Sequence, residues 1–219
     1  MWLKVDPGLR GRFPGLKAKI LRIEGVRVER EDAELERFKE EVIKRVRARW
    51  TLLQLREEPI FRAYRDFFWR IGIDPTKVRP AAEALIRRVL RGRPIPKINT
   101  LVDAYNLASM ETAIALAAFD ADRLGGELLM REARAGEEFL GIGMEAPRRL
   151  RGGEVVVEDG EKLIAIYPYR DAEESKITLQ TQRVLLMVCG VPGIVEEALE
   201  EAGQVALDYV TRFCGGKRV

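Results

Sequence analysis

A chain of 219 residues with 47% hydrophobic and 33% charged residues can bury one full core, and its formal net charge of +3 does not by itself indicate a nucleic-acid partner. It contains no histidine, which excludes Ser-His-Asp and Cys-His nucleophiles, histidine general bases and histidine-bearing zinc sites. Cys189 and Cys214 have no second ligand pair, so we expect two reduced thiols, no metal and no cofactor.

The chain has no run near the roughly 20 apolar residues that span a bilayer, and its first residues, MWLKVDPGLRGRF, lack the apolar core of a signal peptide. We therefore expect a cytoplasmic protein with no membrane partner. Many Arg and Glu residues and few Asn and Gln residues are typical of thermophilic proteins, because amides are thermolabile. The sequence leaves the oligomeric state open.

The first third of the chain predicts a strand and two helices. Apolar residues in 17–28 indicate the strand, and Asp32 is the predicted cap of a helix over 33–49. Pro59 begins the next helix, which Gly72 ends. Its aromatic residues are expected in the core rather than as a stacking platform for bases: Phe61, Tyr64, Phe67, Phe68 and Trp69.

Two short helices are predicted to begin at Asp74-Pro75 and Arg79-Pro80. Residues 77–97 carry seven basic side chains against Glu83 alone. This cluster is either a solvated helix face or a patch that contacts phosphates. The residues predicted to bind nucleic acid are Arg87, Arg88, Arg91, Arg93 and Lys97.

The next helix, from about residue 99 or 100, gathers the uncharged polar residues that the chain otherwise avoids. Both asparagines of the chain, Asn99 and Asn106, lie here, as does Ser109, one of only two serines. Asn99, Asp103, Asn106 and Met110 recur at spacings of four, three and four and so share one helix face. A polar stripe on a buried helix needs hydrogen-bond partners or a ligand.

Each member of this stripe has a structural and a functional interpretation. Thr100 and Asp103 approximate a capping box, so Asp103 either supports the first turn or contacts a ligand. Asn106 lies a turn further in, where capping cannot explain it. Ser109 is expected to bond to a helix carbonyl, and the whole stripe could instead form a satisfied buried network.

The second half of the chain predicts short β-segments. The run AIALAAF could continue the polar helix or form a buried strand, and 154–168 indicates a hairpin that turns at Asp159-Gly160. A polar segment, which is either an exposed loop or part of a site, and a helix after Gly193 complete the chain. The candidate site residues of that segment are Arg170, Asp171, Ser175, Lys176 and Thr178.

The segment NTLVDAYNLASMETAIALAAFDADRLGG resembles the core motif of the B3/B4 domain, the editing module of the phenylalanyl-tRNA synthetase beta subunit. The likeness extends through RVLRGRPIPKINTLVDAYN, the hairpin GGEVVVEDGE and YRDAEESKITLQTQRVLL, over roughly residues 55–190. It implies an α+β fold with helices packed on an unusual β-sandwich. Residues 56–219 would form this domain, and residues 1–55 a strand and helix packed on its core.

The resemblance also implies a pocket between the polar helix and the β-layer, with Asn106 in it. Two positions depart from the synthetase pattern: Ala117 replaces the histidine before A-F-D, and Leu179 stands at the apparent position of the glutamate that senses the tyrosine hydroxyl. A site without a buried partner for that hydroxyl cannot strongly prefer tyrosine.

These observations lead to the hypothesis of a freestanding aminoacyl-tRNA editing module. Asn106 and Asp103 are its candidate catalytic residues. Its candidate substrate-binding residues are Asn99, Ser109, Arg170, Asp171, Ser175, Lys176 and Thr178. The alternative is a non-catalytic protein that binds a free amino acid, another small ligand or RNA in the same pocket.

Overall fold

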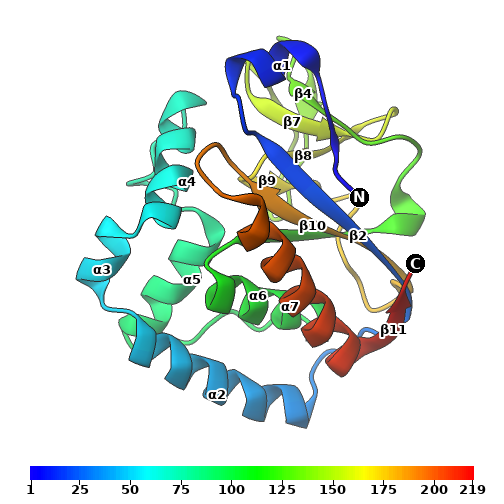
Figure 1. The fold of residues 1–219 in the computed structure, drawn as a ribbon. Helices are drawn as coiled ribbons and strands as arrows, with labels where there is room; N and C mark the ends of the chain where they lie inside the picture. The colour runs from blue at the N-terminus through cyan, green and yellow to red at the C-terminus, as the bar shows by residue number, and fades with distance from the viewer.

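The computed structural model describes all residues, 1–219, and consists of a helical layer packed on two β-sheets (Figure 1). The α-helices are α1 Pro7–Arg12, α2 Ala33–Arg49, α3 Leu52–Glu57, α4 Pro59–Arg70, α5 Ala81–Leu90, α6 Thr100–Thr112 and α7 Glu196–Cys214. A single 3-10 turn, η1, covers Ala121–Arg123. This arrangement confirms the predicted α+β class.

Local sequence signals fix most of the helix boundaries. Asp32 caps α2 by accepting a hydrogen bond from the Leu35 N–H at 2.7 Å, as predicted. The sequence did not indicate α3, which begins with a capping box formed by Thr51 and Gln54. The helix predicted at Asp74 is instead a turn, because the Asp74 side chain accepts the Thr76 N–H at 2.8 Å.

The four-stranded sheet has the order β11-β2-β10-β3, and all its pairs are antiparallel. Its strands are β2 Lys17–Val26, β3 Ala115–Asp120, β10 Arg183–Gly190 and β11 Gly215–Arg218. The ambiguous apolar run is therefore the strand β3, and Ala113, with a φ of 62°, ends the helix before it. Helix α7 lies across this sheet (Figure 1).

The five-stranded sheet has the order β1-β4-β7-β8-β9. Its strands are β1 Lys4–Val5, β4 Leu129–Glu132, β7 Val155–Glu158, β8 Leu163–Ile166 and β9 Arg170–Asp171. The predicted hairpin is confirmed as β7 and β8, and the Asp159 carboxylate accepts the N–H groups of Glu161 and Lys162 at the turn. A two-stranded ribbon pairs β5 Glu138–Phe139 with β6 Arg148–Arg149.

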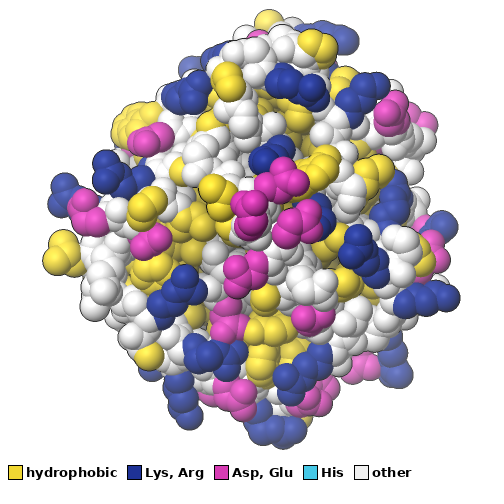
Figure 2. Space-filling model, in the orientation of Figure 1, with side chains coloured by type: hydrophobic (Ala, Val, Ile, Leu, Met, Phe, Trp, Pro, Cys, Tyr) yellow, Lys and Arg dark blue, Asp and Glu magenta, His cyan; other side chains and the backbone are white.

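One core of 46 buried residues joins both sheets to α6 and α7, and a second core of 14 lies among the helices. Strand β2 pairs with β10 over eight residues, so the N-terminal segment contributes an interior strand. None of the helices combines the length and low charge needed to cross a bilayer. Acidic side chains gather in the middle of the face that α7 crosses (Figure 2), where Glu196, Glu197, Glu200 and Glu201 are exposed on that helix.

Candidate functional site

A cavity of about 110 Å³ lies where the helical layer meets both sheets. Three segments form most of its wall: β3, the end of β8 with the turn into β9, and β10. The lining residues are Ala81, Ala115, Leu116, Ala117, Ala165, Tyr167, Pro168, Tyr169, Arg170, Asp171, Met187 and Cys189. Most of the wall is apolar, and four alanines leave space that larger side chains would fill.

Strand register brings the wall together. In the pair of β3 and β10, Ala117 lies opposite Met187 and Ala115 lies opposite Cys189. Across the β8–β9 pair, Ala165 lies opposite Asp171. Because alternate residues of a strand share a face, Ala115 and Ala117 lie on one face of the four-stranded sheet, and the Ala165–Asp171 pair adds a wall from the five-stranded sheet.

Asp171 is the only carboxyl group that lines the cavity. It is half-buried, and neither of its carboxylate oxygens accepts a hydrogen bond or forms an ion pair within the chain. Burial raises its pKa to about 7. The adjacent Arg170 does not neutralise it, because its guanidinium donates to the Ile142 carbonyl at 2.9 Å and lies over the Tyr169 ring. A carboxyl with a pKa near 7 can accept and return a proton at neutral pH.

The thiol and phenol groups near Asp171 stay protonated. Burial raises the pKa of the Cys189 thiol well above its usual value, so this thiol is a poor nucleophile. Burial and the negative charge of Asp171 both raise the pKa of Tyr105, which reaches toward this region from α6. The Tyr167 hydroxyl donates to the Gly190 carbonyl at 2.7 Å. Proton transfer in this cavity therefore falls to Asp171.

The first turn of α6 uses its polar residues structurally. Asn99 is the N-cap, and its Oδ1 accepts the Val102 N–H at 2.9 Å. Asp103 is 2% exposed, pairs with the equally buried Lys39 at 2.7 Å, and accepts the Ile98 N–H at 3.0 Å. These contacts match the capping alternative for Asp103, with the cap at Asn99 instead of Thr100.

In the second half of the helix, Ser109 is hydrogen-bonded within the chain and Asn106 is not. The Ser109 hydroxyl donates to the Ile114 carbonyl at 2.6 Å and is buried. Asn106 is half-buried, its side chain makes no hydrogen bond within the chain, and it lies outside the cavity wall. The fold thus leaves Asn106 as the one polar member of the stripe whose hydrogen-bonding groups are unused.

We expect Asn99→Ala to lower the free energy of unfolding by about 1 kcal/mol, because the Val102 N–H loses its cap. Asn106→Ala is the matched control and should change the unfolding free energy by less than about 0.5 kcal/mol, since it breaks no internal bond. Urea denaturation of both variants measures the difference. Equal losses in the two variants would contradict the division of roles between the two asparagines.

The predicted site residues from β9 onward do not share one site. Asp171 and Arg170 line the cavity, Ser175 is buried with an unpaired hydroxyl, and Lys176 pairs with Glu173. Thr178 lies in an open cleft of about 710 Å³ that also contains Lys97 and Asn99.

Leu179 lies in that same open cleft and is 39% exposed, so it does not face the cavity that Ala117 lines. The cross-strand neighbour of Ala117 that lines the same cavity is Met187. The assignment of Leu179 to the family's glutamate position stays a prediction from sequence.

The basic cluster at 77–97 is partly neutralised. Arg87 donates to Glu83 at 2.7 Å, and Arg65 and Arg79 also pair with this fully buried carboxylate. Lys97 pairs with Glu31 at 2.6 Å. The members that are exposed and have no carboxylate partner are Arg88, Arg91 and Arg93.

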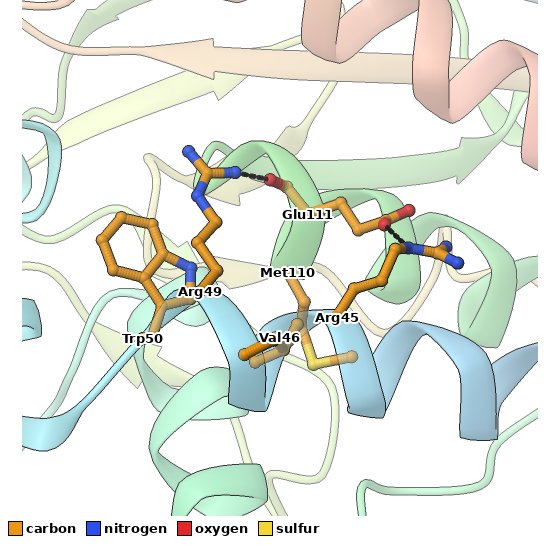
Figure 3. A pocket seen from close by; sticks show the side chains of 7 residues that line it. Arg45, Val46, Arg49, Trp50, Met110 and Glu111 are labelled. Atoms are coloured by element: carbon orange, nitrogen blue, oxygen red, sulfur yellow. Dashed lines mark hydrogen bonds and ion pairs between the residues drawn. The ribbon is translucent and has the colours of Figure 1, made fainter.

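A second hollow, of about 410 Å³, lies between α2 and the end of α6 (Figure 3). Its charged groups already contact one another: Arg45 pairs with the Glu111 carboxylate at 2.5 Å, and Arg49 donates to the Glu111 carbonyl at 2.7 Å. The one carboxylate of this hollow is therefore already paired, and no free acid lines it. No three Cys, Asp or Glu side chains converge anywhere in the chain as a metal ion would require.

A family model described as the B3/4 domain matches residues 63–215, which include the whole cavity wall. The chain belongs to the B3/4 domain family. It is 38% identical over 111 residues to a phenylalanine–tRNA ligase beta subunit of Geobacter metallireducens, and 32% identical over 117 residues to that of Fusobacterium nucleatum. These matches cover 50% and 53% of the chain but only 14% of each relative.

A solved N-terminal fragment of the phenylalanyl-tRNA synthetase beta subunit from Pyrococcus horikoshii has the same fold. The TM-score is 0.51 at 15% identity, and the match covers 99% of this chain and 49% of that one. The recognised family and the fold expected from it are therefore confirmed.

Sequence reasoning missed three features of this B3/4 domain. Trp69, expected in the core, is 56% exposed, while the other four aromatic residues of its helix are buried as predicted. Met187 carried no polar signal, yet it lies opposite Ala117 in the cavity. The isolation of Asp171 was not visible because its neighbours in space are distant in sequence.

Proposed function

We propose that this B3/4 domain is an aminoacyl-tRNA editing module that binds the charged end of a tRNA and hydrolyses its aminoacyl ester. The observation that carries the proposal is Asp171, a half-buried, unpaired carboxyl with a pKa of about 7 in a small, largely apolar cavity. The relatives named as phenylalanine–tRNA ligase beta subunits support a tRNA substrate. Asp171 replaces the assignment of catalysis to Asp103, whose carboxylate Lys39 already occupies.

The chemistry requires one general base. Ionised Asp171 takes a proton from a water molecule as the water oxygen attacks the ester carbonyl carbon. The tetrahedral intermediate collapses, the bond from the carbonyl carbon to the ribose oxygen breaks, and the proton passes from Asp171 to that oxygen. The products are a free amino acid and a tRNA with a free terminal hydroxyl, and Asp171 is ionised again. The neighbouring ribose hydroxyl can help hold the water, since the ester is already activated.

The size of the cavity supports a small aminoacyl side chain. An apolar cavity of about 150 Å³ is known to bind benzene, and this one is smaller, at about 110 Å³. Its apolar wall around Ala117 and Met187 suits an aliphatic group. We therefore propose that esters of small aliphatic amino acids are better substrates than tyrosyl or phenylalanyl esters.

Other predicted residues have supporting roles in this proposal. Arg88, Arg91 and Arg93 would contact phosphates of the tRNA end, because they are exposed and lack carboxylate partners. Asn106 would donate or accept a hydrogen bond to the terminal nucleotide, since its amide is unused within the chain.

The test is a panel of mischarged tRNAs that carry alanyl, valyl, tyrosyl and phenylalanyl esters. Hydrolysis of the aliphatic esters above the rate in buffer is expected, and their hydrolysis should fall when Ala117→Val narrows the cavity. The larger valyl ester should be affected more than the alanyl ester. The melting temperature of the variant provides the folding control. No ester cleaved faster than in buffer would overturn the proposal.

A non-catalytic binding protein is the second candidate. The methyl group of Ala117 stands where the resembling synthetase motif has a histidine, so the wall lacks one polar group of that motif. In this case free alanine or valine should raise the melting temperature of the protein while all aminoacyl esters remain intact.

A further inference from the structure

Another opening, a cleft of about 620 Å³, lies between the end of α4 and the β6 segment. Five arginines and one exposed tryptophan line it: Arg12, Arg70, Arg148, Arg149, Arg151 and Trp69. We call this the arginine cleft. Its only acidic lining residue is Glu154, whose Oε1 accepts the Arg151 N–H at 2.9 Å. The cleft is separate from the Asp171 cavity and shares no lining residue with it.

Three guanidinium groups of the arginine cleft have no carboxylate within ion-pair distance: those of Arg70, Arg148 and Arg151. Arg12 pairs with Glu132 at 2.6 Å, and Arg149 pairs with Glu138 at 3.4 Å on an exposed surface. Positive charge therefore remains in excess along the cleft, as an anionic partner requires.

The side chains of Arg12 and Arg70, on one side of the arginine cleft, are already ordered by contacts within the chain. The guanidinium groups of Arg12 and Arg70 lie 4.9 and 4.6 Å from the centroid of the Phe13 ring. Arg70 also donates to the Arg12 carbonyl at 3.0 Å. Because these side chains are already ordered, binding a partner loses less side-chain conformational entropy.

Trp69 differs from the other aromatic residues of α4. Phe67 and Phe68 are 1% exposed, whereas Trp69 is 56% exposed and lines the cleft together with Arg70. An exposed indole among unpaired guanidinium groups is the combination that binds unpaired nucleotides, with bases stacked on the ring and phosphates on the arginines.

We propose that the arginine cleft is an RNA-binding surface, in which Arg70, Arg148 and Arg151 contact phosphates and the Trp69 indole stacks on an unpaired base. The identity of the RNA as tRNA rests on the proposed function. The cleft would thus hold a part of the tRNA other than its charged end, because the aminoacyl group occupies the separate Asp171 cavity.

The experiment measures binding of unacylated tRNA by fluorescence anisotropy at several salt concentrations. The triple variant Arg148→Ser, Arg149→Ser, Arg151→Ser is expected to reduce the slope of log K against log salt by about 2. The control variant Arg22→Ser, Arg37→Ser, Lys44→Ser removes the same charge from exposed positions elsewhere and should leave the slope nearly unchanged.

The stacking role of Trp69 is tested separately in the same binding assay. Trp69→Ala should weaken binding roughly five- to 150-fold, and Trp69→Phe should restore much of the loss.

The outcomes distinguish failure of the arginine cleft from failure of the editing proposal. Equal slopes for the two triple variants, or unchanged affinity in Trp69→Ala, would overturn the arginine cleft and leave the editing proposal standing if ester hydrolysis persists. No binding of tRNA by the unmodified protein would overturn both. Circular dichroism and thermal melting confirm that the variants, all at exposed positions, remain folded.

Discussion

Asp171→Asn is expected to abolish most of the proposed ester hydrolysis and at the same time to stabilise the protein at pH 8. Loss of a general base lowers the rate about 10²- to 10⁴-fold. In the unmodified protein, the rate above buffer should rise with pH and level off above about 7, where Asp171 is ionised. The asparagine variant should lack this rise, because an amide does not titrate.

The gain in stability follows from the sign of the pKa shift. The pKa of Asp171 is about 7 in the folded protein and about 3.9 in an unfolded chain, so the folded state binds the extra proton. The favourable contribution of the protonated carboxyl is complete below about pH 4 and is lost as the pH rises through 7. Asparagine stays neutral, and its advantage should grow to the order of 4 kcal/mol at pH 8, since each unit of pKa difference is worth about 1.4 kcal/mol.

Urea denaturation between pH 5 and pH 8 measures the difference in unfolding free energy, and Asp66→Asn makes the same chemical change at an exposed position of α4. That control should alter neither hydrolysis nor the pH dependence of stability. If Asp171→Asn is destabilising at pH 8, the carboxyl has a partner that the structure does not show. If stability rises while hydrolysis is unchanged, the general-base role is wrong and the electrostatic description remains.

Lys39→Met is expected to destabilise the protein by about 3–5 kcal/mol. Lys39 and Asp103 are 5% and 2% exposed and pair at 2.7 Å, so removal of the ammonium leaves a buried carboxylate without its partner. Lys44→Met removes a charge of the same kind from the exposed face of α2 and should change stability by less than about 0.5 kcal/mol. Denaturant unfolding measures both effects.

The double variant Lys39→Met, Asp103→Asn should recover most of this loss. Asparagine keeps an oxygen that can accept the Ile98 N–H, and it brings no charge into the interior. A single variant that loses less than 1 kcal/mol would show that the pair is hydrated. A double variant as unstable as the single one would show that the lysine contributes by packing and not by charge.

The longer helices and the hairpin were predictable because their signals are local, whereas the short α3 was missed and a turn at Asp74 was mistaken for a helix. The cap at Asp32 and the turn at Asp159-Gly160 each act within a few residues. The rarity of asparagine was a weaker guide to function. Asn99 meets the needs of a helix terminus, and Asn106 has no internal partner, although both stood out equally in the sequence.

The candidate site could not be predicted from local signals, because the environment of Asp171 depends on residues that are distant in the sequence. Asp171 is one of many carboxylates in a charged chain, and only the pairing of β3, β8, β9 and β10 shows that it lies among alanines without an ion-pair partner. Trp69 follows the aromatic pattern of α4, but the helix turns it away from the core toward the arginine cleft.

The position of β2 between β10 and β11 separates the limits of the family match from the limits of a folding unit. The match begins at residue 63, yet β10, which carries Met187 and Cys189 into the cavity, has β2 as its partner along eight residues. A fragment that began at residue 63 would present that edge of β10 unpaired, and an exposed apolar edge strand favours aggregation. For this chain, the smallest piece that keeps the cavity wall intact includes the strand that the family model leaves out.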